Sequence, residues 1–344
     1  MKRIYHVFAG LLFITATAQA QLDNSQTITK TGTTAAQFLK IGIDARSAGM
    51  GNAYTAMQGA LTSMNANPAG IGFMQNAEAL FSHHEWIADI NFNYFAFGFN
   101  IDGLGTIGAS ITSLTTPEDI VRTIDQPEGT GELFNAGDFS LNLSFAKQLT
   151  DKFTIGGTMK FINQSIWHSN ANAIAADLGA IFVTPFNGVR LGASIQNFGS
   201  DMRMFGRDVR FSEDPDPNNQ GNVEFVNAEF ETDAFPLPLL FRVGLSGEFY
   251  KAENVRASFS IDAMEPNDNS SAVNGGVELA FSETFFVRGG YSTLFREDSE
   301  EGLTFGGGIH YRLWGNSSML KIDYAYGDYG LLDNVQRFSV GITF

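Results

Sequence analysis

The sequence predicts an all-β protein, a fourteen-stranded antiparallel transmembrane β-barrel of the outer membrane with a small amino-terminal plug or hatch. Three observations support this fold class. The chain ends in a strand with one apolar face, the same alternating pattern recurs along it, and short and long connections take turns between the alternating segments. Because each barrel strand has one lipid-facing and one lumen-facing side, periodicity is a better guide than the overall proportion of apolar residues.

The first twenty residues are predicted to be a cleavable secretory signal. Lys2 and Arg3 precede an apolar run over residues 7–14, and Ala18-Gln19-Ala20 fits the small-x-small pattern of a signal-peptidase site. The apolar run is far shorter than the roughly 20 residues that a membrane-spanning helix needs. We therefore expect export, with residues 1–20 removed and no helical membrane anchor.

Residues 21–75 are expected to form a compact, plug-like segment. Gly49 and Gly51 permit a tight backbone turn, and Asn67-Pro68-Ala69-Gly70 stops a helix and turns the chain. These four residues fit a simple helix stop as well as a gating role, and both interpretations stay open. The pair of glycines lacks the third glycine of a nucleotide-binding fingerprint, so no nucleotide site is predicted.

Residues 76–344 are predicted to form the barrel. Period-2 alternation recurs there in segments of about 9 to 12 residues, the length that crosses the hydrocarbon layer at a tilt. In the clearest case, Phe139, Leu141 and Leu143 alternate with Ser140 and Asn142. The expected strands cover residues 78–87, 91–101, 104–114, 137–149, 152–165, 173–184, 189–197, 238–249, 254–264, 271–281, 284–294, 302–313, 318–328 and 334–344.

The last expected strand alternates from residue 334 to the end of the chain. Its apolar face carries Phe338, Val340, Ile342 and Phe344, and its polar face carries Ser339, Gly341 and Thr343. An aromatic carboxy-terminus on such a strand is typical of bacterial outer-membrane barrels, whose assembly machinery recognises the last strand.

The connections between the expected strands alternate in length. Residues 102–103, 150–151, 184–188, 250–253, 282–283 and 313–317 are tight, whereas residues 115–136, 198–237 and 295–301 are longer. Barrels with both ends in the periplasm have short periplasmic turns and longer external loops. A soluble β-sandwich would not need this parity.

Charged residues occupy the middle of many expected strands. They are Lys160, Asp177, Arg190, Arg242, Glu248, Arg256, Asp262, Glu278, Arg288, Arg312, Lys321 and Asp323. In a secreted β-sandwich with a dry core these charges would be left unpaired, and on a lipid-facing side they would be costly. We therefore expect them to line a hydrated, ion-paired lumen.

Composition excludes other classes of protein. The chain carries 37 acidic and 21 basic residues, a formal net charge of −16, so nucleic acid is not an expected partner. It contains no cysteine, which excludes a disulfide framework and a lipoprotein anchor at the cleavage site.

The amino-terminal pattern resembles a known family. Phe38-Leu39, Asp44-Ala45-Arg46, Ala48-Gly49-Met50-Gly51, Ala53 and Asn67-Pro68-Ala69-Gly70 together resemble the PorV/PorQ family, which is similar to the FadL-like outer-membrane transporters. The resemblance implies that Gly49, Gly51, Asn67, Pro68 and Ala69 belong to a plug or hatch in the lumen, with the last three near the periplasmic entrance. It identifies no catalytic group.

The longest connection, residues 198–237, interleaves apolar and charged residues. Met202, Met204, Phe205 and Phe211 are the residues that we expect to contact something outside the barrel, whereas the alternative is a lid folded over the mouth. An exposed apolar patch there would receive a protein partner or an amphipathic ligand.

The sequence predicts no catalytic, cofactor-binding or metal-binding residues. His83 and His84 are adjacent in an expected strand, so their side chains face opposite sides and at most one serves any one site. His168 and His310 stand alone, without the spacing of metal ligands. Neither a nucleophile with a base nor a metal centre is indicated.

These observations predict a non-enzymatic protein of the outer membrane. The resemblance implies a role in protein secretion or surface attachment through type IX secretion, with outer-membrane lipid, secretion-system proteins and secreted cargo as partners. The alternative is a FadL-like passive transporter of hydrophobic small molecules such as long-chain fatty acids, with an amphipathic small molecule as its ligand. A charged lumen without an evident apolar groove disfavours the transporter.

Overall fold

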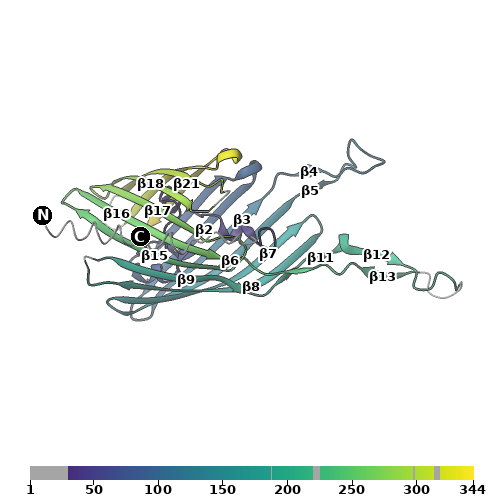
Figure 1. Cartoon of the computed structure of the whole chain (residues 1–344), viewed down its shortest axis with the longest axis horizontal. Coiled ribbons are helices and arrows are strands. Elements are labelled where there is room, and N and C mark those ends of the chain that lie inside the picture. The colour runs from purple at the N-terminus through teal and green to yellow at the C-terminus, as the bar shows by residue number, and fades with distance from the viewer. Residues whose placement is uncertain (1–29, 187, 220–224, 297–298, 314–317) are drawn as a thin grey trace. The chain divides into compact units, whose positions relative to one another are not determined.

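The computed structural model describes residues 30–344 except 187, 220–224, 297–298 and 314–317. In this part of the chain, fourteen long antiparallel strands form a closed ring, in which β1 pairs with β2 and β21, and β8 pairs with β7 and β9. The predicted barrel is confirmed (Figure 1). The predicted signal peptide lies outside the described residues.

The barrel strands match the predicted ones to within a few residues at each end. They are β1 (Glu78–Glu85), β2 (Asn91–Ile101), β3 (Gly105–Thr115), β6 (Ala136–Thr150), β7 (Phe153–Ile166), β8 (Ser169–Val183), β9 (Arg190–Gly199), β15 (Leu240–Lys251), β16 (Val255–Pro266), β17 (Ala272–Phe281), β18 (Phe285–Leu294), β19 (Leu303–Arg312), β20 (Met319–Asp328) and β21 (Asn334–Thr343).

The remaining elements are short. The strands are β4 (Asp119–Ile120), β5 (Leu133–Phe134), β10 (Met202–Arg203), β11 (Phe205–Gly206), β12 (Arg210–Glu213), β13 (Val226–Glu229) and β14 (Ala234–Phe235). The helical turns are η1 (Gln37–Lys40), α2 (Ala45–Gly49), α3 (Ser63–Ala66), η2 (Pro68–Phe73), η3 (Ile87–Asp89), η4 (Arg207–Val209) and η5 (Gly330–Leu332). No helix among the described residues is long and apolar enough to cross a membrane.

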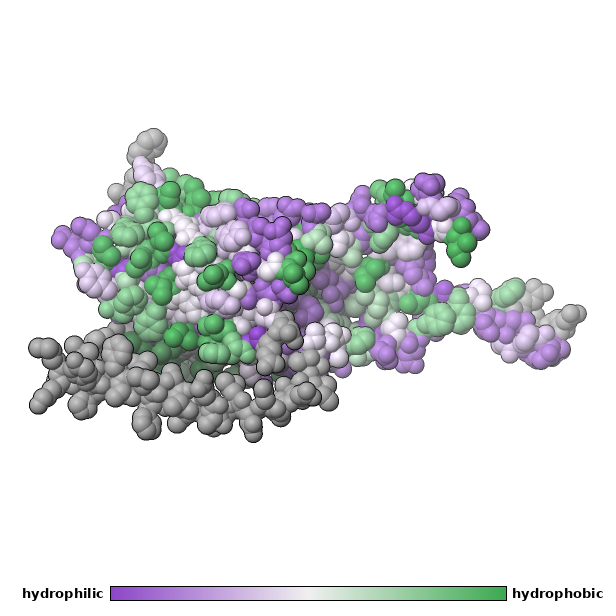
Figure 2. Space-filling view, turned by 45° about the horizontal axis from the view of Figure 1, so that its top comes forward, coloured by the Kyte–Doolittle hydropathy of each residue, from purple (hydrophilic) through white to green (hydrophobic). Residues whose placement is uncertain are grey.

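Side-chain alternation gives the barrel an apolar outer surface. In β6, Leu141 and Leu143 are 47% and 60% exposed on the outer face, while Ser140 and Ser144 are buried on the inner face. The last strand behaves in the same way, with Phe338 exposed and Ser339 buried. Figure 2 shows apolar residues gathered over the strands of the visible face and polar residues on the projecting hairpins. Such an outer face suits lipid.

Connections at the two ends of the barrel differ in length, as predicted. At one end the strands are joined by tight turns, such as residues 102–104 between β2 and β3. At the other end, the connection from β3 to β6 contains the β4–β5 hairpin, and the connection from β9 to β15 contains β10 to β14. The β4–β5 hairpin and the β12–β13 hairpin both project beyond the barrel in Figure 1. We call the end with the long connections the mouth.

Three neighbouring strands are longer than the rest. β6, β7 and β8 have 15, 14 and 15 residues, whereas β1 has 8 and β15 has 12. On the outer face of the extension, Asn163 donates to Asn172 at 2.8 Å, directly beyond the exposed apolar pair Phe161 and Ile174. The change from apolar to amide side chains indicates that this part of the wall rises out of the apolar layer.

Residues 31–75, the amino-terminal segment, lie against the inner faces of the strands. η2 packs on β3, β6, β7 and β8, and α2 packs on β18 to β21, so contacts reach opposite sides of the ring. Asp44 is the N-cap of α2, because its carboxylate accepts the backbone N–H of Ser47 at 3.1 Å. Most of the segment is buried, including Tyr54, Leu61 and Ile71.

Candidate functional site

One inward-facing carboxylate anchors the middle of the amino-terminal segment. Oδ2 of Asp262, a fully buried residue of β16, accepts the backbone N–H groups of Tyr54 and Thr55 at 2.8 and 2.9 Å and the Thr55 hydroxyl at 2.7 Å. Backbone donors in a segment without regular structure need such acceptors when they are buried. Asp262 therefore replaces the secondary structure that this stretch lacks.

Asn67, Pro68 and Ala69 contact β7 and β8 near the tight-turn end of the barrel. The Asn67 side chain accepts the Ala69 N–H at 3.0 Å and donates to the Ala180 carbonyl of β8 at 3.0 Å. Pro68 and Ala69 press against Gly156 of β7, where an added Cβ would lie only 2.5 Å from their backbone atoms. The helix stop is therefore also a point of attachment to the wall.

Gly49 and Gly51 contact the opposite wall. Gly51 has a φ of +65°, and a Cβ there would lie 2.6 Å from the Tyr291 carbonyl oxygen and 2.7 Å from that of Gly275. A Cβ added at Gly49 would likewise lie 3.0 Å from the Gly306 Cα. Both the backbone conformation and the close approach require glycine at residue 51.

A network of ion pairs joins the segment to the barrel wall. Arg46 of α2 pairs with Glu278 at 3.1 Å, and Glu278 pairs with Arg288 at 2.8 Å. Arg288 also reaches Asp323 at 2.6 Å. Glu278 and Arg288 are fully buried, Asp323 is nearly so, and Arg46 keeps 17% of its side chain exposed. The prediction of a hydrated lumen is therefore wrong for the buried part of this network: the charges are paired, as predicted, but the amino-terminal segment covers them.

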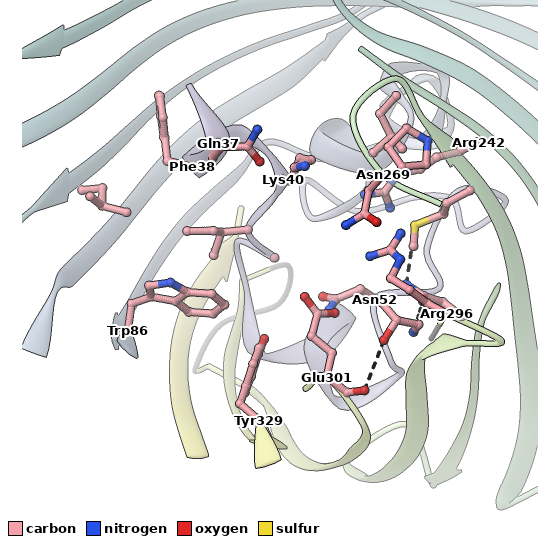
Figure 3. Close-up of a pocket in the computed structure, with 18 of the residues that line it drawn as sticks. Gln37, Phe38, Lys40, Asn52, Trp86, Arg242, Asn269, Arg296, Glu301 and Tyr329 are labelled. Atoms are coloured by element: carbon pink, nitrogen blue, oxygen red, sulfur yellow. Dashed lines mark hydrogen bonds between the residues drawn. The ribbon is translucent and has the colours of Figure 1, made fainter. Parts of the chain in front are cut away.

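A cavity of about 460 Å³, the mouth cavity, lies where the segment meets the mouth of the barrel (Figure 3). Its lining comes from the segment, from strand ends and from several connections at the mouth. The residues are Gln37, Phe38, Lys40, Ile41, Gly42, Asn52, Trp86, Ile90, Leu114, Asp138, Leu240, Arg242, Met264, Pro266, Asn269, Asn274, Thr293, Arg296, Glu301 and Tyr329. The volume is within the range of small-molecule sites.

Two aromatic rings form one wall of the mouth cavity. Trp86 and Tyr329 meet edge to face, with ring centroids 5.1 Å apart, and both point toward the space in Figure 3. Behind them the buried Arg337 donates to the Tyr329 hydroxyl at 3.0 Å and lies 5.4 Å from the Trp86 ring centroid. The guanidinium therefore fixes the orientation of the aromatic wall.

Charged groups surround the remainder of the mouth cavity. Lys40 pairs with Asp268 at 2.8 Å, which leaves its charge compensated. Burial raises the pKa of Glu301 above its usual value, although the guanidinium groups of Arg296, Arg337 and Arg242 and the ammonium of Lys40 act in the opposite direction. No described residue forms a hydrogen bond or ion pair with the Glu301 carboxylate.

The external loop residues expected to contact a partner separate into two pairs. Met202 is buried in a cluster with Phe38 and Ile162, and Met204 packs on the same cluster, as the lid alternative expects. Phe205 and Phe211 are 50% and 37% exposed. Only this second pair, on β11 and β12, is available to a partner.

The two adjacent histidines face opposite sides, as predicted. His83 is exposed on the outside, where its Nδ1 lies 2.9 Å from Asn93 Oδ1. His84 is buried, stacks on Phe92 with ring centroids 4.5 Å apart, and has no hydrogen-bond partner among the described residues. Across the described ranges, no group of three or more acidic, histidine or cysteine side chains is placed to hold a metal ion.

The sequence predicted which charged residues line the lumen, but it did not predict the mouth cavity. Arg242 was among the predicted lumen-facing charges, whereas Trp86, Glu301 and Tyr329 come from three separate connections. Nothing in their spacing indicates that they meet. Tyr329 directly follows the expected strand 318–328, and this position could have served as a signal, because the ends of the strands at the mouth surround the lumen.

A family model described as the type IX secretion system protein PorV matches residues 23–204, more than half of the chain. That range contains the amino-terminal segment and the barrel strands from β1 to β9. No curated protein sequence matches the chain significantly.

Solved structures with a similar fold are bacterial channels. The CymD monoaromatic hydrocarbon channel aligns with a TM-score of 0.54 and 14% identity, over 88% of this chain and 96% of that one. The Ralstonia pickettii toluene transporter TbuX aligns with 0.52 and 14%, over 88% and 97%. The P. putida toluene transporter TodX aligns with 0.55 and 12%, over 88% and 96%. At these identities the similarity shows the fold alone.

Proposed function

The chain belongs to the PorV family of type IX secretion system proteins, and from this premise we propose that it is a non-enzymatic outer-membrane barrel that acts in protein secretion or surface attachment. The family match over residues 23–204 carries the proposal. We propose that the protein is located in the cell outer membrane after residues 1–20 have been removed.

The attachment of the amino-terminal segment to the inner wall supports a function in which the lumen of the barrel is blocked. Asp262, Glu278 and Asn67 attach the segment to β16, β17 and β8, which belong to one arc of the ring, and α2 packs on β18 to β21 beyond that arc. We propose that residues 21–75 act as a plug, with Gly49, Gly51, Asn67, Pro68 and Ala69 as its contact points. A closed barrel suits a protein that presents a surface to partners.

The projecting part of the mouth supports a protein partner. Phe211 of β12 packs on Phe230 with ring centroids 4.7 Å apart, yet both rings remain exposed, by 37% and 68%. Phe205 is 50% exposed on β11. Aromatic residues that are exposed above a membrane favour contact with another protein. We propose that Phe205 and Phe211 contact a secretion-system protein or secreted cargo.

The test is made in the native host. Deletion of the gene is compared with variants of the chromosomal copy, and the extracellular and surface proteomes are measured together with uptake of a labelled long-chain fatty acid. We expect deletion to remove secreted cargo from the surface and to leave precursors in the periplasm. Normal secretion with reduced uptake would contradict the proposal and favour transport.

A pair of matched variants sharpens this test. Phe205→Ser with Phe211→Ser removes the exposed aromatic surface at the mouth, and we expect it to reduce secretion while the barrel still accumulates. Phe186→Ser is the control, because Phe186 is 76% exposed but lies in a tight turn at the opposite end. Equal secretion defects in both variants would argue against a partner at the mouth.

Passage of hydrophobic small molecules is the second candidate function. The observation that favours it is the mouth cavity, which has apolar and aromatic lining in a barrel whose fold is shared with hydrocarbon channels. Ile41, Gly42 and Asn52 of the amino-terminal segment form part of its lining, so passage would require the segment to move. The uptake measurement above separates this candidate from the first.

A further inference from the structure

Arg242, in β15, is a buried cation without a counterion in contact among the described residues. The residue is 8% exposed and lines the mouth cavity. Its Nε is buried with no hydrogen-bond partner, and no hydrogen bond or ion pair joins its guanidinium to any other residue that the structure describes. A buried charge left in this state costs several kcal/mol, by general estimates. Something that enters the cavity and pairs with Arg242 would offset that cost.

Other buried cations of the lumen differ from Arg242. Lys160 pairs with Asp177 at 2.7 Å, and Arg288 pairs with two carboxylates. Arg337 forms no ion pair with a described carboxylate, and its Nε is buried without a hydrogen-bond partner, but its guanidinium donates to the Tyr329 hydroxyl and lies against the Trp86 ring. Within the same part of the chain, Arg242 has neither kind of partner.

The carboxylates that act on Arg242 lie too far away to form an ion pair with it, although Oδ1 of Asp262 is buried without a hydrogen-bond partner. Asp262, Glu301 and Asp177 act on it electrostatically, yet none lies within the 4.0 Å of an ion pair. Oδ2 of Asp262 is occupied by three donors from the amino-terminal segment, and Asp177 is paired with Lys160. Among the described residues, no carboxylate therefore occupies the guanidinium, which lines the mouth cavity.

Apolar surface completes the site. Met264 is the cross-strand partner of Arg242 and packs with Leu240, and all three line the mouth cavity. Trp86 and Tyr329 lie across the space from Arg242 (Figure 3). The Oδ1 atom of Asn52 is a further buried polar atom of the lining without a partner among the described residues. A cavity with apolar walls and few convergent polar groups is the usual form of a small-molecule site.

We propose that the mouth cavity binds an amphipathic organic monoanion, with its acidic group on Arg242 and its apolar body against Trp86 and Tyr329. The amino-terminal segment lines the inner side, so the ligand is held at the mouth and is not passed through the closed barrel. Glu301 and Asp138 in the lining disfavour dianions such as phosphate. This site is separate from the secretion role, and its test does not depend on that role.

The test uses the full mature chain in a non-ionic detergent and a matched set of probes. The probes are 1-naphthalenesulfonate, which is ionised at every accessible pH, and the neutral 1-naphthalenesulfonamide, which has the same body. Dissociation constants are measured by titration calorimetry for wild type, Arg242→Met and Arg122→Met. Arg122 is an exposed arginine of the connection between β3 and β6 and serves as the control.

We expect the sulfonate to bind wild type at least about tenfold more tightly than the sulfonamide, because a charged hydrogen bond is at stake. Arg242→Met should remove this preference and leave the sulfonamide unaffected, and Arg122→Met should change neither. Met264→Trp, which fills the cavity without touching the charge, should abolish binding of both probes. It keeps the test informative if Arg242→Met does not fold.

Three results would overturn the proposal. They are the absence of saturable binding, equal affinities for the sulfonate and the sulfonamide in wild type, and sulfonate affinity that Arg242→Met or Met264→Trp leaves unchanged.

Discussion

Substitution of Asp262 by alanine is expected to release the amino-terminal segment while the barrel stays folded. The change removes three hydrogen bonds and leaves the buried N–H groups of Tyr54 and Thr55 without an acceptor. Each orphaned donor costs about 1–3 kcal/mol. Because the burial cost of the carboxylate disappears in the same step, we place the net loss in the lower half of the combined range, at about 2–3 kcal/mol.

A loss of this size corresponds to a roughly 30- to 150-fold larger population of the released segment, since about 1.4 kcal/mol is tenfold. Amide hydrogen exchange followed by mass spectrometry measures it, because local opening appears as faster exchange of the amides that open. We expect peptides covering residues 45–67 to exchange faster by this factor, and peptides from β6 to β8 to remain protected.

Two further variants make the experiment specific. Asp262→Asn keeps an acceptor oxygen in place and should accelerate exchange much less. Asp119→Ala removes an exposed carboxylate of β4 and should have no effect. The reasoning is refuted if Asp262→Ala leaves residues 45–67 protected, or if protection is lost equally across the barrel strands.

Three other predictions concern single residues. Glu278→Gln should destabilise the protein by about 3–5 kcal/mol in denaturant unfolding, because it breaks a buried ion-pair network. The control is Glu283→Gln, which changes an exposed carboxylate that pairs with Arg256, and it should cost less than about 1 kcal/mol. Gly51→Ala should lower the free energy of unfolding by at least about 2 kcal/mol, since both the positive φ and the facing carbonyl oxygens oppose a side chain. The control is Gly32→Ala, where φ is also positive but the space is open, and it should lower the free energy of unfolding by about 1 kcal/mol. Affinity for 1-naphthalenesulfonate should rise severalfold as the pH is lowered through the raised pKa of Glu301, because protonation removes a negative charge that repels the probe, and Glu301→Gln should show the higher affinity at every pH.

Each of these expectations has a result that would contradict it. Similar unfolding midpoints for the Glu278 and Glu283 variants would show that the network contributes little. Equal costs at Gly51 and Gly32 would mean that the facing carbonyl oxygens do not matter. For Glu301, persistence of the pH dependence in Glu301→Gln would assign it to Asp138, the other carboxylate among the described residues that line the mouth cavity.

The strands could be predicted because their signal is local. The alternation of Phe139, Leu141 and Leu143 with polar neighbours depends only on a period of two, and the barrel requires that period in every strand. The break at Asn67 and Pro68 was likewise visible, because a proline cannot continue the preceding helix and disfavours helical backbone at the residue before it, although Pro68 also begins η2.

Partners across the lumen could not be predicted. Arg46 and Glu278 are separated by 232 residues, and their pairing depends on closure of the whole ring and on the path of the amino-terminal segment. For the same reason the sequence suggested water around the lumen charges, since alternation says which side a residue faces and nothing about what fills that side. Met202 and Phe205 differ in burial because β10 pairs with β14 and places Met202 in the cluster with Phe38, whereas β11 pairs with β8 and leaves Phe205 exposed.

The longer wall formed by β6, β7 and β8 gives the molecule a front and a back in the plane of the membrane. A barrel of even height would present the same rim to a neighbour from every direction. Here the amide-bearing extension rises on one arc, and the connections that carry both projecting hairpins begin at its two borders, after β3 and after β9. A membrane protein that binds this arc fixes both the rotation of the barrel about the membrane normal and its height in the membrane. A single contact is therefore enough to orient the barrel within a larger assembly.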